Sequence, residues 1–182
     1  DLALGSPQGG LTTSRSGVVH VYLSTGSVIP EDPSARIPDP ADESAAEFGA
    51  AIAIADVDGD GFADLVVGAP SKNAGVQDGG AVLLFRGGAS PTFTEAITID
   101  HPDDRADVDF GTSVANLGDL DGDGFEDVIV GAPGMGMGGS AYLLYGDATT
   151  PLTRTERIEH EAPQEDEFFG ASVAGVGDLD GD

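Results

Sequence analysis

The sequence contains no cysteine. This absence excludes disulfides, thiolate zinc sites and a cysteine nucleophile. Basic residues are also scarce: 7 Lys and Arg stand against 33 Asp and Glu, which gives a formal net charge of -26. Nucleic acid and anionic membrane surfaces are therefore disfavoured as direct partners, and the electric field around the chain favours cations.

Long apolar runs are absent as well. No run approaches the roughly 20 residues that a membrane-spanning helix requires, so we expect no membrane insertion. Residue 1 opens no signal-peptide pattern, but the chain begins inside a motif that recurs later, so this says nothing about a longer parent. With 182 residues, 40% of them apolar, the chain can bury a core, and its 28 Gly and 11 Pro predict many turns.

What the sequence does contain is an internal repeat. A Phe-Gly pair begins at Phe48, Phe110 and Phe169, at intervals of 62 and 59 residues. Each pair is followed eight or nine positions later by a run of aspartates. The aspartates of these runs are Asp56, Asp58, Asp60 and Asp64, then Asp119, Asp121, Asp123 and Asp127, then Asp178, Asp180 and Asp182.

A Gly-Ala-Pro tail follows each complete run, at Leu65–Pro70 and Val128–Pro133, and Asp1–Pro7 resembles the same tail without its head. We therefore expect a window of about three repeats from a longer array. The expected units are the C-terminal part of a first repeat (1–47), a complete second repeat (48–109), a complete third repeat (110–168) and the start of a fourth (169–182), truncated in its aspartate run.

Each unit is predicted to contain four short β segments. The first is Ala50–Ala55, and the second, Leu65–Val67, is expected to stop at the Gly-Ala-Pro turn signal. The third is Ala81–Phe85, matched by Val18–Tyr22 and Ala141–Tyr145, and the fourth surrounds Ile37, Ile99 and Ile158. No helical period is present, so the fold class is all-β. Four strands in about 60 residues predict a propeller blade, and three blades cannot close a ring.

The aspartate runs have the spacing of a calcium loop. Carboxylates at positions 1, 3 and 5 converge, Gly at positions 4 and 6 permits the sharp turn, and a position 7 carbonyl and a position 9 carboxylate complete an oxygen cage. Hard oxygen ligands without His or Cys favour calcium over zinc or copper, and magnesium keeps more of its water. An EF-hand needs Glu at position 12, where this chain has Val67 and Val130.

Phe-Gly, the Asp-x-Asp-x-Asp-Gly-x-x-Asp loop and Gly-Ala-Pro at this spacing resemble the FG-GAP repeat of integrin α-subunits and many bacterial surface proteins. The resemblance implies a seven-bladed propeller with structural calcium between the first two strands of a blade, away from the ligand-binding face. Gly5-Ser6-Pro7 departs from Gly-Ala-Pro, and the absence of cysteine favours a microbial surface or secreted member. The metal ligands implied by position are Asp56, Asp58, Asp60, the Phe62 carbonyl and Asp64; Asp119, Asp121, Asp123, the Phe125 carbonyl and Asp127; and, in the truncated motifs, Asp178, Asp180, Asp182 and Asp1.

Several motifs that resemble catalytic or nucleotide sites have simpler interpretations. Residues 134–139 satisfy GxGxxG, but a strand follows where a dinucleotide site needs a helix. Ser113 and Ser172 lie in patterns like a nucleophile elbow, yet they are equivalent repeat positions that favour a small residue. The three histidines, His20, His101 and His160, are expected to be neutral or solvated. The acidic loops 38–47, 102–109 and 163–167 are expected to be solvated surface. No enzyme activity is expected.

Three functions remain open. The leading hypothesis is a non-catalytic, calcium-stabilised propeller, extracellular or at the cell surface, that binds a protein or glycan through loops opposite the metal. The second is a structural protein that self-associates through its repeats, with the motifs at Asp1 and Asp182 completing a shared calcium loop between neighbours. The third is an accessory propeller domain of a larger secreted hydrolase.

Overall fold

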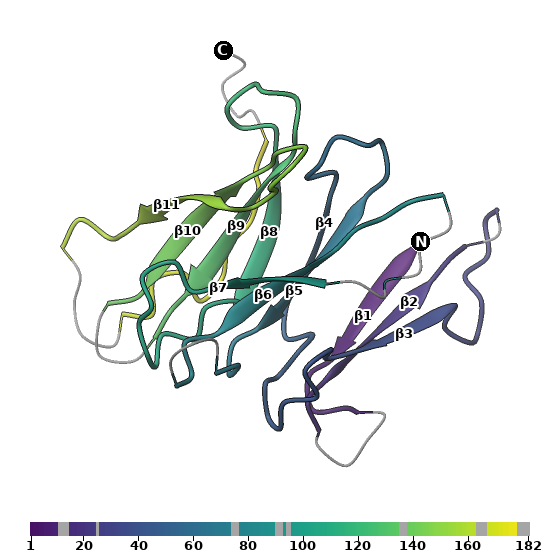
Figure 1. Cartoon of the computed structure of the whole chain (residues 1–182), viewed down its shortest axis with the longest axis horizontal. Helices are drawn as coiled ribbons and strands as arrows, with labels where there is room; N and C mark the ends of the chain where they lie inside the picture. The colour runs from purple at the N-terminus through teal and green to yellow at the C-terminus, as the bar shows by residue number, and fades with distance from the viewer. Residues whose placement is uncertain are drawn as a thin grey trace.

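The computed structural model describes residues 1–10, 15–24, 26–73, 77–89, 93, 96–134, 138–162 and 167–177. Within them, eleven strands form three antiparallel sheets that lie side by side in chain order (Figure 1). No helix that could cross a membrane occurs among these residues. The all-β fold built of propeller blades is thus confirmed.

Each sheet is a simple meander in which sequential strands are neighbours. The first sheet has three strands and the other two have four. The first sheet contains β1 (Leu2–Ser6), β2 (Val18–Tyr22) and β3 (Ala35–Pro38). The second contains β4 (Ile52–Ala55), β5 (Asp64–Ala69), β6 (Ala81–Phe85) and β7 (Ala96–Asp100), and the third β8 (Ser113–Gly118), β9 (Asp127–Ala132), β10 (Ser140–Tyr145) and β11 (Arg154–Ile158).

The expected β segments all form strands, with differences in extent: β4 begins at Ile52, two residues after the predicted start, and β5 begins one residue before its predicted start. β5 does not stop at Val67 but continues through Gly68 and Ala69, which pair with Val82 and Ala81 of β6. The Gly-Ala of the tail is therefore strand, because its backbone groups find partners on β6. The turn begins only at Pro70.

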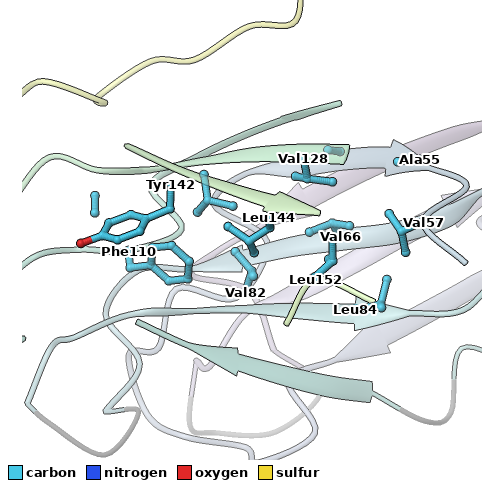
Figure 2. Close-up of a cluster of buried hydrophobic side chains, with 13 residues drawn as sticks. Ala55, Val57, Val66, Val82, Leu84, Phe110, Val128, Tyr142, Leu144 and Leu152 are labelled. Carbon is cyan, nitrogen blue, oxygen red and sulfur yellow. The ribbon is translucent and has the colours of Figure 1, made fainter. Parts of the chain in front are cut away.

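The core lies between the sheets, and strands β5 and β6 contribute to it with both faces. Leu65, Val67, Leu83 and Phe85 pack against the first sheet. Their alternate neighbours pack against the third sheet, where Figure 2 shows Val66, Val82 and Leu84 facing Val128 and Leu144. Successive side chains of a strand point to opposite faces, so an unbroken apolar run supplies two separate cores.

The Phe-Gly pairs join each blade to the blade before it. Phe48 forms an isolated parallel bridge with Gly17, and Phe110 forms the same bridge with Gly80. Both phenylalanines are fully buried. Phe48 meets Phe85 edge to face at 5.9 Å, and Phe110 meets Tyr142 at 5.6 Å. The phenylalanine that recurs in the repeats is therefore an anchor between blades.

Glycine is required where the blades approach most closely. A Cβ on Gly68 would lie 2.0 Å from the carbonyl oxygen of Gly111 in the next blade. Gly5 stands in the same relation to Gly49, and Gly131 to Gly170. The Gly-Ala-Pro glycine of one repeat thus lies directly against the Phe-Gly glycine of the next.

One acidic connection differs from expectation because it is not wholly solvated. Asp39 is 2% exposed and its carboxylate accepts hydrogen bonds from the amides of Ala41 and Glu43. Lys72, also buried, places its Nζ 3.3 Å from Asp39 and 3.4 Å from Glu43. The buried charge of Asp39 is tolerated because it is paired with Lys72 and accepts hydrogen bonds from backbone amides.

His101 is buried between the second and third sheets. Its ring meets those of Phe110 and Tyr142 edge to face, and its Nδ1 accepts hydrogen bonds from the amides of Asp103 and Arg105. Burial lowers the pKa of His101. The charge of Asp103 opposes this shift, and those of Arg105 and Arg157 add to it. His101 is therefore a neutral, hydrogen-bonded core residue.

We expect Gly68→Ala to destabilise the chain by about 3 kcal/mol, because the new methyl group meets a backbone oxygen that cannot rotate away. Gly26→Ala is the control: Gly26 has a φ of +77° with nothing within 4 Å of its Cβ position, so only backbone strain of about 1–2 kcal/mol is expected. Urea unfolding of both variants measures the difference. Equal destabilisation would contradict a tight contact between the blades.

We also expect His101→Asn to make the free energy of unfolding depend less on pH below pH 7. The unfolded state binds a proton near pH 6.5 while the native state resists it, so the stability that His101 supplies is present above pH 6.5 and is lost as the pH falls. The stability difference between wild type and variant should shrink between pH 7 and 5, by at most about 1.4 kcal/mol per pH unit. A difference that is constant with pH in urea unfolding would refute this role.

Candidate metal centre

Two aspartate loops project from the same end of the molecule (Figure 1). The first loop, residues 56–64, joins β4 to β5, and the second loop, residues 119–127, joins β8 to β9. Both connect the first two strands of a four-stranded sheet. The repeat thus places two chemically similar loops in equivalent positions on neighbouring blades.

Three carboxylates converge in each loop. Asp56, Asp58 and Asp64 each place a carboxylate oxygen within 4.8 Å of the others. In the second loop, Asp119, Asp121 and Asp127, at positions 1, 3 and 9, also each place a carboxylate oxygen within this distance of the others. The predicted position 5 ligands, Asp60 and Asp123, lie outside these groups.

The position 1 aspartates hold the loops in shape by accepting amide hydrogen bonds. Asp56 accepts from the amides of Asp60 and Gly61, at 3.1 and 3.0 Å. In the second loop, Asp119 accepts from the amides of the equivalent residues, Asp123 and Gly124, both at 3.0 Å. Gly61 and Gly124 have φ angles of +85° and +97°, which glycine adopts without strain. The local sequence therefore builds the same tight turn twice.

The position 9 aspartates are buried and connect each loop to its sheet. Asp64 is 1% exposed; its two oxygens accept from the amides of Val57, at 3.1 Å, and Gly87, at 2.7 Å. Asp127 is fully buried and accepts from Leu120 and Gly146 in the same way, at 2.8 and 2.9 Å. Each carboxylate thus joins the start of its loop to the residues after the third strand.

An arginine pairs with the position 3 aspartate of each loop. Arg86 lies 3.2 Å from Asp58, and Arg154 lies 2.6 Å from Asp121. The two arginines come from different places, one directly after β6 and the other in β11. The repeat pattern therefore gave no signal for either of them.

Electrostatics make the clusters unfavourable when all carboxylates are ionised. Burial raises the pKa of Asp64 to about 6; the charges of Asp58 and Asp60 add to the shift, and the two amide hydrogen bonds oppose it. Burial, together with the charges of Asp121 and Asp123, also raises the pKa of Asp127. A bound cation would remove this cost.

The donor set fits a hard divalent cation. Every side chain in the two groups offers carboxylate oxygen. Calcium takes oxygen ligands at about 2.3–2.6 Å, so its ligand oxygens lie within about 5 Å of one another. The separations within each group meet this limit. Asp56, Asp58 and Asp64, and likewise Asp119, Asp121 and Asp127, are therefore the side chains that would hold the ion.

The truncated motifs are only partly described. Asp1 accepts hydrogen bonds from the amide and hydroxyl of Ser24, at 2.8 and 3.1 Å. Asp64 accepts a hydrogen bond from the amide of Gly87, and the two residues are as far apart in sequence as Asp1 and Ser24. Asp1 therefore makes the contact expected of a position 9 aspartate. Asp178, Asp180 and Asp182 lie outside the described residues.

The motifs that resemble other sites have structural roles where they are described. The Ser113 hydroxyl donates to the carbonyl of Gly170 at 2.8 Å, so it helps to join two repeats. Of the GxGxxG stretch, residues 135–137 lie outside the described residues, and the strand predicted after it is β10.

In buffer stripped of divalent ions, we expect Asp64 to make the chain less stable as the pH rises. The native state binds its proton up to about pH 6 and the unfolded state only up to about 3.8, so the stability from this proton is full below pH 3.8 and is lost as the pH rises to 6. The stability of wild type relative to Asp64→Asn should fall across this window, by at most about 1.4 kcal/mol per pH unit.

Urea unfolding at pH 4.5, 5.5 and 6.5 measures this trend. Asp32→Asn, which removes an exposed carboxyl between β2 and β3, controls for the loss of one negative charge. A wild-type to Asp64→Asn difference that rises with pH would contradict the buried, proton-binding carboxyl.

Comparison with known proteins agrees with the repeat pattern. A family model described as FG-GAP repeat matches residues 48–85 and 110–144. Integrin alpha-PS2 of Drosophila melanogaster is 32% identical over 202 residues, which cover 100% of this chain and 13% of that protein. Integrin alpha-3 of Cricetulus griseus is 36% identical over 145 residues, covering 74% of this chain and 13% of that protein.

Integrin alpha-4 of Xenopus laevis is 36% identical over 137 residues, with 74% of this chain and 13% of the relative covered. The chain therefore spans only about an eighth of the length of these relatives. The family model nevertheless covers both aspartate loops, the Phe-Gly pairs at Phe48 and Phe110, and the first three strands of the second sheet and nearly all of the first three of the third. The chain belongs to the FG-GAP repeat family and is similar to integrin alpha subunits.

Proposed function

We propose that the chain is a non-catalytic, calcium-binding β-propeller module of the cell surface or extracellular space that recognises a protein or glycan in adhesion. The observation that carries the proposal is the pair of equivalent three-carboxylate groups in equivalent hairpins. The similarity to integrin alpha subunits supports the adhesive role.

Calcium would stabilise the hairpins by compensating the charge of their carboxylates. In the first loop, Val57 follows the position 1 ligand and is fully buried in the core between the second and third sheets. Asp64, at the other end of the loop, opens β5. A cation that holds Asp56 near Asp64 would therefore stabilise both the hairpin and the core on which it lies.

The opposite end of the second sheet supplies a surface for recognition. A groove of about 660 Å³ is lined by Glu47, Ser71, Asn73, Asp78 and Asp109, among others. Its walls come from the β3–β4, β5–β6 and β7–β8 connections, at the ends of the strands away from the aspartate loops. Several carboxylates line it, so a partner with basic or hydrogen-bond-donating groups has the complementary chemistry.

Calcium is expected to raise the melting temperature of the chain. At 100 times its dissociation constant, calcium adds about 2.7 kcal/mol per site to the stability, provided that it does not bind the unfolded chain. The double variant Asp58→Asn/Asp121→Asn, which removes one carboxylate from each group, should lose this response. Asp32→Asn should keep it.

Differential scanning calorimetry with calcium or with excess EGTA at pH 7.5 measures the shift, and isothermal titration calorimetry measures the stoichiometry. Wild type with the same melting temperature in both conditions would reject structural calcium. An equal shift in the double variant would place the ions elsewhere.

A further inference from the structure

The two aspartate loops are in direct contact across the boundary between blades. The contact is made by Glu126, at position 8 of the second loop, and by Asp56, at position 1 of the first. The amide of Asp56 donates to Glu126 Oε2 at 2.8 Å, and the amide of Glu126 donates to the carbonyl of Asp56 at 3.1 Å. Two hydrogen bonds of opposite direction therefore join these residues.

Neighbouring groups fix this contact in place. Asn116 of β8 donates from its Nδ2 to Glu126 Oε2 and to the carbonyl of Ile54, both at 2.9 Å. The Phe125 ring lies against Gly59, where a Cβ would be 2.7 Å from Phe125 Cε1. Hydrogen bonds from Asn116 and Asp56 thus hold the carboxylate of Glu126 against the first loop.

The position of Glu126 in the second loop gives the contact a consequence for metal binding. Its neighbours in sequence are Phe125 and Asp127, a predicted carbonyl ligand and a buried member of the carboxylate group. Ordering of residues 125–127 would fix Glu126, and Glu126 holds the backbone of Asp56, a ligand candidate of the first loop. The two loops are thus connected through Glu126.

We propose that Glu126 couples the two calcium loops, so that occupation of the second loop raises the calcium affinity of the first. This inference rests on the proposed function, since it requires that both loops bind calcium. Glu126 acts as a positioning residue through Asp56 and is not itself a ligand. Coupling between sites is reciprocal, so occupation of the first loop raises the affinity of the second by the same factor.

The chain contains its own control for substitution at this position. The residue equivalent to Glu126 in the first loop is Ala63. Glu126→Ala therefore gives the second loop a side chain that the first loop already accommodates. Glu126→Gln keeps an acceptor for the Asp56 amide but removes the charge, so it separates hydrogen bonding from electrostatic attraction of calcium.

The test is a calcium titration of ¹⁵N-labelled protein followed by NMR. The amides of Gly61 and Gly124 report on the two loops separately, because each donates to the position 1 carboxylate of its own loop. Asp121→Asn weakens the second loop without touching Glu126. We expect it to weaken calcium binding at Gly61 about fivefold when Glu126 is present, and not when residue 126 is alanine.

Glu126→Gln should retain most of the coupling, and Asp58→Asn should weaken binding at Gly124 by the same factor. Saturable binding at both glycines with no effect of Asp121→Asn on Gly61 would overturn the coupling while leaving the proposed function intact. Equal loss in Glu126→Gln and Glu126→Ala would also overturn it, because Glu126 would then act by charge alone. No calcium response at either glycine would reject both the proposed function and the coupling.

Discussion

The buried carboxylate at position 9 of each aspartate loop connects the charged and apolar parts of this protein. In a chain with a net charge of -26, Asp64 and Asp127 take a negative charge out of water and satisfy it with two amides each. One amide belongs to the loop and the other follows the third strand of the sheet. The loop is thereby attached to the blade. Its exposed charged residues are held next to the residues that the strands bury.

This arrangement also explains why acidic residues are tolerated so close to the core. Val57 and Asp58 are adjacent, yet Val57 is fully buried in the apolar core and Asp58 is paired with Arg86. The bend at these two residues directs Val57 into the core and Asp58 towards Arg86, so one residue separates the two environments. The carboxylate groups can therefore lie next to the core without an apolar side chain having to leave it.

Sequence alone predicted the features that depend on neighbours in the chain. The strands followed from β-branched and apolar runs bounded by glycine. The spacing of the aspartates predicted four converging carboxylates in the first loop, of which the structure groups Asp56, Asp58 and Asp64 and leaves Asp60 outside. Contacts between distant residues could not be predicted in this way. Glu126 meets Asp56 across 70 residues, and Lys72 meets Asp39 across 33. Nothing near Glu126 in sequence distinguishes it from the many solvated acids, because its partner is a backbone amide on another blade.

The division of β5 and β6 between two cores has a consequence for how the protein folds and unfolds. A blade whose two faces both need a neighbour has no independent core, so its stability is the sum of the interfaces on either side. Such a molecule behaves as a one-dimensional cooperative array, in which a blade flanked on both sides is the last to open. Hydrogen exchange would then be slowest in β5 and β6, the strands that are buried on both faces.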